Sequence, residues 1–237
     1  MSKKIANEIA VILISSLPDK GMKSLGHKGL MKLGDITLIE AQINHILAAY
    51  RHAHIYITCS FDAKKIIRAI KNINKNTSIS IIEHDLDTET NFGQPLRLAL
   101  EHIPESKPVI ILNTNIIAHT RSLVALKYDR SFILSNTNKA FDTNVGCTYN
   151  TSDGLVEYIF YDLEPKICEC VYLTPQDRHL LETILCSKTD NQFLFEIINS
   201  AIVKELKLHI QQINTKDVIL FNSLTLFRRI EKILQCP

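Results

Sequence analysis

The chain has 237 residues, 46% of them hydrophobic, and its 27 basic and 25 acidic residues leave a formal net charge of +2. This size and composition predict one globular domain with a sizeable core, and they exclude a strongly charged nucleic-acid-binding or membrane-surface protein. No apolar run is long enough to span a membrane, and no signal-peptide pattern follows the first residues.

The first half of the chain alternates between strand and helix patterns. The unbroken apolar run at 8–14 predicts a strand buried on both faces, and Thr37 is the expected N-cap of a helix over 37–50. Further strands are predicted at 53–58, 78–83 and 108–113, and further helices at 62–72 and 93–103. This rhythm predicts a Rossmann-like, doubly wound and mostly parallel sheet, with any ligand site at the carboxyl ends of the strands.

The second half has a less regular pattern, and its 144–173 region is predicted to form an antiparallel extension of the sheet. Strands are predicted at 130–135, 144–149, 155–161, 168–173, 207–213 and 217–221, and helices at 175–186, 190–206 and 223–235. A turn at 151–154 joins two of these strands as a hairpin. Because no linker rich in glycine or proline divides the chain, we expect a single domain over 1–237, with halves at 1–120 and 121–237.

The six cysteines are scattered and form no C-x-x-C pair. Zinc sites need more ligands in a tighter arrangement, so the pattern predicts reduced and mostly buried thiols in a cytoplasmic protein.

Five short runs carry a resemblance that extends nearly from end to end. They are Ser15-Ser16-Leu17-Pro18-Asp19-Lys20-Gly21-Met22, His27-Lys28-Gly29-Leu30, Leu33-Gly34-Asp35-Ile36-Thr37-Leu38-Ile39, Ile111-Leu112-Asn113-Thr114-Asn115 and Phe221-Asn222-Ser223-Leu224. In order and spacing they resemble the sugar-phosphate and choline-phosphate nucleotidyltransferases, whose fold is shared in outline with GT-A glycosyltransferases. The resemblance implies a nucleotide-binding half over 1–120 and an acceptor-side half with a closing helix over 121–237.

The departures from the family pattern fall on the residues that carry the chemistry. Leu17 and Asp19 stand at the two glycine positions of the triphosphate loop, and Gly21 stands at the position of its arginine. Asn115 and Asn222 occupy the positions of the two metal-binding aspartates. A neutral amide offers magnesium one carbonyl oxygen, whereas such sites normally use carboxylates and phosphates.

Some features of the nucleotide site are retained. Lys28 matches the family lysine, although His27 replaces the preceding proline. Lys20 and Lys23 lie in the same basic cluster, which is either a solvated loop or a loop that faces a phosphate. Lys28, with Lys20 and Lys23, is thus a candidate vestigial nucleotide contact, and Lys28 is the expected catalytic residue if the protein is active.

Gly93 and Gln94 lie where the resemblance places a loop that contacts the nucleotide base. They are candidate base contacts, but a helix entry with Asn91 as cap and Pro95 in its first turn explains the segment equally well.

Lys139 and Lys166 can be matched to a family lysine that contacts the second substrate, although simple surface exposure explains both. Four acidic residues are scattered over the hairpin side, and no tight spacing supports a compensating metal site: Glu157, Asp162, Glu164 and Glu169.

Taken together, these substitutions predict a catalytically degenerate protein that serves as an interaction or structural component, with a viral assembly as one candidate setting. The alternative is an active nucleotidyltransferase that transfers a nucleotidyl group to a phosphorylated small molecule, and a third reading is a nucleotide- or sugar-binding module without turnover. We expect no cofactor, with Mg²⁺ required only if the alternative holds. The expected partner is a protein or a second copy, with neither nucleic acid nor membrane, and the expected location is cytoplasmic or within a virion.

Overall fold

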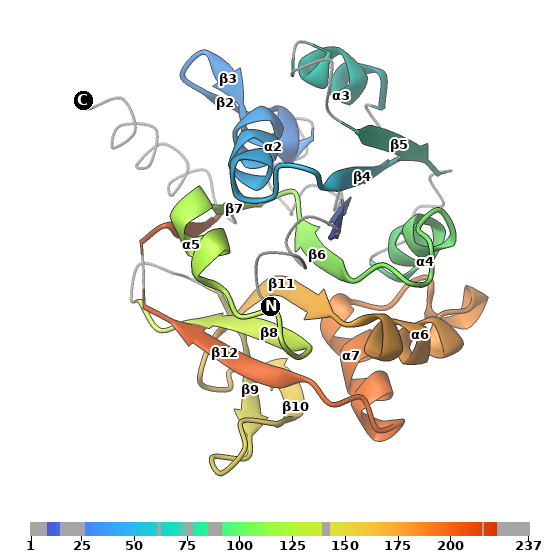
Figure 1. The fold of residues 1–237 in the computed structure, drawn as a ribbon, viewed down its shortest axis with the longest axis vertical. Coiled ribbons are helices and arrows are strands. Elements are labelled where there is room, and N and C mark those ends of the chain that lie inside the picture. The colour runs from blue at the N-terminus through green and yellow to red at the C-terminus, as the bar shows by residue number, and fades with distance from the viewer. Residues whose placement is uncertain are drawn as a thin grey trace.

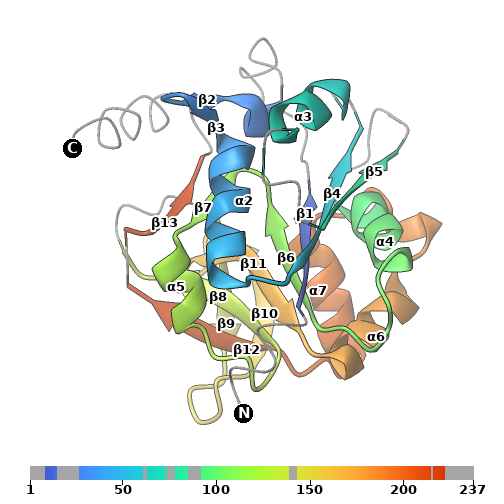
Figure 2. The ribbon, with the colours of Figure 1, turned by 45° about the horizontal axis from the view of Figure 1, so that its top comes forward.

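A seven-stranded sheet forms the centre of the molecule in the computed structural model, which describes residues 9–14, 27–60, 63–71, 73, 78–84, 92–138, 143–214 and 216–221. The strand order is β12-β8-β11-β6-β1-β4-β5 (Figures 1 and 2). The strands are β1 (Ala10–Ile14), β4 (His54–Cys59), β5 (Ile79–Glu83), β6 (Val109–Asn113), β8 (Phe132–Asn136), β11 (Ile167–Leu173) and β12 (His209–Ile213).

The sheet is mostly parallel, as predicted. β1 pairs in parallel with β4 and β6, β4 with β5, and β12 with β8, while β11 runs antiparallel to both of its neighbours. β1 therefore lies inside the sheet, and all five of its residues are buried. Its unbroken apolar run is explained by this position, because both faces of the strand meet helices.

Among the described helices, three cover each face of the sheet, and Figure 1 shows α2 and α5 on the opposite side from α4, α6 and α7. The helices are α2 (Leu38–Ala49), α3 (Ala63–Ile70), α4 (Gly93–Glu101), α5 (Thr120–Ala125), α6 (Pro175–Ile184) and α7 (Leu194–Val203). β1 supplies Val11 and Leu13 to the core under α2, α3 and α5, and Ile12 to the core under α4, α6 and α7. Among the described helices, none is both long and apolar enough to cross a membrane.

The local signals at the helix ends explain where most helices begin. Thr37 caps α2 as predicted, in a capping box in which Thr37 N donates to Glu40 Oε2 at 2.7 Å and Glu40 N donates to Thr37 Oγ1 at 3.3 Å. The helix predicted at 190–206 starts later, at Leu194, because Phe193 has extended backbone and its N–H donates to Glu196 Oε2 at 2.7 Å. The last predicted helix, at 223–235, lies outside the described residues.

Short antiparallel pairs flank the main sheet. β9 (Val145–Tyr149) pairs antiparallel with β10 (Val156–Tyr161), so the region is antiparallel as predicted, but these two strands form a separate sheet and only β11 joins the main one. β7 (Ile116–Ala118) pairs with β13 (Val218–Leu220), and β2 (Lys32–Leu33) with β3 (Ile36–Thr37). The 3₁₀ turns η2 (Lys28–Leu30) and η3 (Ser187–Thr189) complete the described elements.

The described cysteines are free thiols, as expected. Cys59, Cys147, Cys168 and Cys170 are buried and Cys186 is exposed. Burial raises the pKa of the Cys147 thiol to about 11, which keeps it in the unreactive thiol form.

Candidate functional site

The turn after β6 lies where the fold predicts a site, at the carboxyl ends of the central strands. Thr114 N donates to Ile14 O of β1 at 2.9 Å, and Asn115 N donates to Asn113 Oδ1 at 3.4 Å. Gln42 of α2 donates from Nε2 to Asn113 O at 3.0 Å and to Ile116 O at 2.6 Å. The turn is therefore held from the sheet and from a helix, and Asn115 has a fixed backbone position.

Asn115 is nearly enclosed, with 6% of its surface exposed. Its Oδ1 has no hydrogen-bond partner, and the same is true of Oε1 of Gln42 and Oγ1 of Thr114 in this part of the structure. Three acceptor oxygens therefore remain unsatisfied on buried side chains around one turn, whereas most buried polar groups are paired. Each of these groups is neutral, so the turn offers a divalent cation no carboxylate.

Glu169 supplies a negative charge next to this turn. Asn113 Nδ2 donates to Glu169 Oε2 at 2.8 Å, and Glu169 lies on β11, directly beside the β6 strand end. Across the residues that the structure describes, no group of three or more histidine, cysteine, aspartate or glutamate side chains is arranged to hold a metal ion.

Asn222 itself lies outside the described residues, but the chain before it can be followed. β13 runs antiparallel to β7 with Leu220 opposite Ile116, and Phe221 N donates to Asn115 O at 2.8 Å. The backbone immediately before Asn222 is therefore hydrogen-bonded to Asn115, although more than a hundred positions separate the two in sequence. The distance between the two asparagine side chains stays a prediction.

Lys28 is buried at the start of the 3₁₀ turn η2, with 3% of its surface exposed, whereas Lys32 is exposed. His27 caps this turn, because its Nδ1 accepts from Gly29 N at 2.9 Å. Lys28 is therefore not a solvent-exposed loop residue. The rest of the predicted phosphate loop, including Leu17, Asp19, Lys20, Gly21 and Lys23, lies outside the described residues.

Gly93 is the first residue of α4, and the chain after α6 packs directly against it. A Cβ atom at Gly93 would lie 1.9 Å from the carbonyl oxygen of Thr189, so only glycine fits there without a backbone shift. Asn91 lies outside the described residues, and Phe92 precedes the first helical residue without a side-chain capping hydrogen bond.

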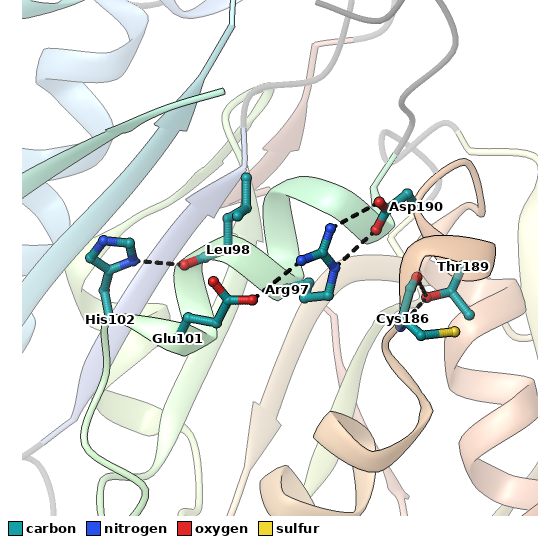
Figure 3. Close-up of polar contacts among 7 residues, drawn as sticks. All are labelled: Arg97, Leu98, Glu101, His102, Cys186, Thr189 and Asp190. Atoms are coloured by element: carbon teal, nitrogen blue, oxygen red, sulfur yellow. Dashed lines mark hydrogen bonds and ion pairs between the residues drawn. The ribbon is translucent and has the colours of Figure 1, made fainter. Parts of the chain in front are cut away.

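The segment from Cys186 to Gln192 covers the N-terminus of α4. Phe92 N donates to Gln192 O at 3.0 Å and Gln94 N donates to Asp190 O at 3.2 Å. Arg97 donates to both carboxylate oxygens of Asp190, at 3.1 and 2.9 Å, and also to Glu101 at 3.2 Å (Figure 3). Chain carbonyls thus already satisfy two of the N–H groups at this helix end, which a bound ligand would otherwise use. Base recognition by Gly93 and Gln94 stays a prediction.

The remaining candidates are dispersed. Glu157, Asp162 and Glu164 are exposed, and Lys166 is 3.8 Å from Glu164 in an ion pair. Lys139 lies outside the described residues.

Sequence reasoning missed the residues that support the candidate positions. Gln42 holds the Asn113–Asn115 turn, and its one available signal was a lone polar residue on the buried face of α2. Thr189 and Asp190 had no signal, because their contact with α4 joins segments about ninety residues apart.

The comparisons agree on the fold. No protein-family model and no curated protein matches the chain. The CTP:phosphocholine cytidylyltransferase from Streptococcus pneumoniae is similar in structure, with a TM-score of 0.76 at 14% identity, covering 96% of this chain and 100% of that one. The inositol-1-phosphate CTP transferase from T. maritima has a TM-score of 0.75 at 9% identity, covering 97% and 95%.

A third similar structure is the nucleoside-diphosphate-sugar pyrophosphorylase from Vibrio cholerae RC9, with a TM-score of 0.73 at 12% identity, covering 94% of this chain and 99% of that one. Identities this low carry information on fold and not on activity. The resemblance predicted from the sequence motifs is therefore confirmed at the level of the fold, and the chain has the nucleotidyltransferase-like architecture over nearly its whole length.

Proposed function

We propose that this protein is a catalytically degenerate nucleotidyltransferase-like protein that acts as an interaction or structural component. The observation that supports the proposal is the state of Asn115. It is a neutral, buried side chain, it sits on a turn held by β1 and α2, and its amide oxygen has no partner.

The physical reason is the dependence of nucleotidyl transfer on charge. Phosphoryl-type transfer relies on positioning and on neutralisation of developing negative charge. Losing one such contact commonly costs about 3–4 kcal/mol of transition-state stabilisation. Asn115 and Asn222 in place of aspartates, with Gly21 in place of an arginine, remove three of these contacts together.

An active nucleotidyltransferase is the second candidate, and Glu169 favours it. Its carboxylate is hydrogen-bonded to Asn113 beside the turn, and it would be the first protein ligand to consider for Mg²⁺ in that case. The similar structures named for CTP-dependent transferases make CTP the first nucleotide to test. No described feature points to a viral assembly, and we leave that setting out of the proposal.

Titration calorimetry separates the two candidates. With CTP, UTP or ATP and Mg²⁺ or Mn²⁺, we expect no binding tighter than about millimolar, a free energy of about −4 kcal/mol. An assay for pyrophosphate release, with phosphocholine and sugar 1-phosphates as acceptors, should give no turnover. Micromolar binding that requires the metal would overturn the proposal, and turnover that Glu169→Gln abolishes would establish the second candidate.

A further inference from the structure

Five aromatic side chains form a contiguous cluster on the surface of β10 and the start of α7, here called the aromatic patch: Tyr158, Phe160, Tyr161, Phe193 and Phe195. Tyr158 stacks on Phe160 with ring centroids 5.9 Å apart, and Phe193 stacks on Phe195 at 5.7 Å. Phe195 joins the two stacks, since it lies 6.1 Å from Phe160 and 5.2 Å from Tyr161.

The aromatic patch is open to solvent. Tyr158, Phe160 and Phe193 are 49%, 45% and 47% exposed, and Tyr161 is 43% exposed. Single exposed apolar residues are ordinary, but a contiguous group of large rings on the surface marks an interaction site. The aromatic patch therefore calls for a partner that packs on ring faces.

The backbone of β10 excludes one kind of partner. Asn199 of α7 accepts from Ile159 N at 2.9 Å and donates to Ile159 O at 2.8 Å. These two bonds occupy the outward-facing peptide groups at the middle of the strand, so an additional strand cannot pair there. The partner must contact the side chains.

The elements that carry the aromatic patch are mainly acidic, with Lys166, which is 3.8 Å from Glu164, directly after β10 and its loop, and Lys204 directly after α7. Residues 145–165, which include β9 and β10, contain four acidic residues and no lysine or arginine. Residues 193–203 contain Glu196 and no lysine or arginine, and the Glu196 carboxylate accepts from the backbone of Phe193. The complementary partner is a cationic surface with some apolar area, because lysine and arginine side chains also pack on aromatic faces.

Helix α3 of the same chain has this chemistry. Residues 63–71 contain four basic residues and no acidic one, and all four are exposed: Lys64, Lys65, Arg68 and Lys71. Ile67 lies among them and is 39% exposed. Figure 1, drawn with the longest axis vertical, shows α3 at the top of the molecule and the β9–β10 pair at the bottom.

We propose that the aromatic patch binds the α3 face of a second copy of this chain, so that copies associate head to tail along the long axis. Two unlike faces make a heterologous contact, which builds rings or open chains of copies. The inference deepens the interaction role proposed above by naming the partner. The test measures association alone. Association can therefore be absent while the protein still lacks nucleotidyl transfer, and association can be present in a protein that does transfer nucleotides.

Sedimentation velocity on the full-length protein, over a wide concentration range, is the first measurement. We expect the average mass to rise with concentration at low salt and to fall in about 0.5 M NaCl, where charge attraction is screened. A protein that stays monomeric at every concentration and salt level would overturn the proposal.

Paired variants test the head-to-tail geometry. Tyr158→Ser with Phe160→Ser disables the aromatic patch, and Lys64→Glu with Arg68→Glu disables α3, so each should weaken association about tenfold or more. Each double variant keeps one intact face, and a mixture of the two should form dimers but nothing larger. Val124→Ser on α5, at a 61% exposed position, is the matched control and should associate like the parent protein.

An alternative contact of the aromatic patch with itself gives a different result. In that case the α3 double variant would still dimerise, the mixture would show no gain, and the proposal would be wrong. Unchanged unfolding midpoints for both variants show that they are folded, since all four altered side chains are exposed.

Discussion

At the scale of single residues, an amide in place of a carboxylate changes what Asn115 can do while the turn around it stays intact. An unpaired carboxylate buried there would carry a large desolvation cost without a cation, whereas a buried amide costs far less. The turn can therefore stay buried without a metal ion.

Restoring both carboxylates tests this substitution. Asn115→Asp with Asn222→Asp should create weak Mn²⁺ binding by calorimetry, because two hard oxygen ligands return. The same variant should show no turnover and should lose about 1–3 kcal/mol of stability without metal, because a charge is buried and the two carboxylates repel each other.

Asn150→Asp is the matched control, since Asn150 is exposed in the β9–β10 turn and its Oδ1 accepts from Ser152 N at 2.9 Å, which an aspartate also does. Equal stability of the control and the double variant would contradict this account of Asn115.

A second prediction concerns Gly93, because its lack of a side chain leaves room for the Thr189 carbonyl. Alanine normally stabilises a helix by about 1 kcal/mol relative to glycine. Here the added Cβ would lie 1.9 Å from a backbone oxygen, so we expect Gly93→Ala to destabilise the protein by about 1–3 kcal/mol in urea unfolding. Gln94→Ala, one residue along, is the control and should be nearly neutral, because Gln94 Oε1 has no partner. A more stable Gly93→Ala variant would mean that the segment at Thr189 moves away easily.

At the scale of elements, Arg178 of α6 holds the end of α4 in place. Its five N–H groups are all used: the Nη atoms donate to the carbonyls of Leu100, Ile103, Pro104 and Lys107, and Nε donates to Glu182. The side chain is almost fully buried, so it joins two helices through bonds that water cannot replace.

Removing this guanidinium should be costly. Arg178→Met leaves four carbonyls and the Glu182 carboxylate without their donor, and we expect a loss of about 3–5 kcal/mol of unfolding free energy. Arg130→Met, at a side chain 56% exposed, should change stability by less than about 0.5 kcal/mol. A loss at Arg178 no larger than that of the control would contradict the bridging role.

The contact between α2 and α5 predicts a dependence on pH. The rings of His45 and His119 lie 4.5 Å apart, and His45 Nδ1 is 3.1 Å from Thr120 Oγ1. Burial, and secondly His119, lower the pKa of His45 below 6.5. The unfolded chain then binds more protons than the folded one, so stability falls as pH drops through about 6.5.

His45→Gln should flatten this decline in unfolding midpoints measured from pH 7.5 to pH 5.5, a range that spans the ordinary histidine pKa of about 6.5. His54, whose pKa is also lowered by burial, should preserve part of the slope. His52→Gln, at an exposed turn position, is the control for the histidine-to-glutamine change itself. If the unfolding midpoint of His45→Gln falls with pH as steeply as that of the parent protein, His45 does not cause the decline.

Most of the long elements were predictable from the sequence, whereas most of the short ones were not, with the three-residue β13, predicted as a strand at 217–221, as an exception. The run at 10–14 and the Thr37 capping signal each contain enough residues to define a strand or a helix start. β7 has three residues and pairs with β13 about a hundred positions away, so no local pattern marks it. The candidate site divides in the same way, because Asn115 follows a strong strand pattern while Gln42 and Thr189 reach the site only through the tertiary fold.

At the scale of the whole molecule, one sheet serves two cores. Alternate residues of β1 point to opposite faces, so Leu13 packs in the core under α2 and Ile12 in the core under α4. A strand shared in this way couples the two cores, and we propose that residues 1–120 and 121–237 fold as one unit.

Thiol labelling in urea tests this unit, because each half has a buried cysteine. Cys59 belongs to the first half and Cys147 to the second, and both are fully buried, with the pKa of each raised to about 11 by burial. If the chain unfolds in one cooperative step, both thiols become reactive at the same urea concentration. Ile12→Ala and Leu13→Ala should each cost about 2–5 kcal/mol and should lower the labelling midpoint of both cysteines equally. Labelling of one cysteine at a lower urea concentration than the other would show instead that the two halves unfold separately.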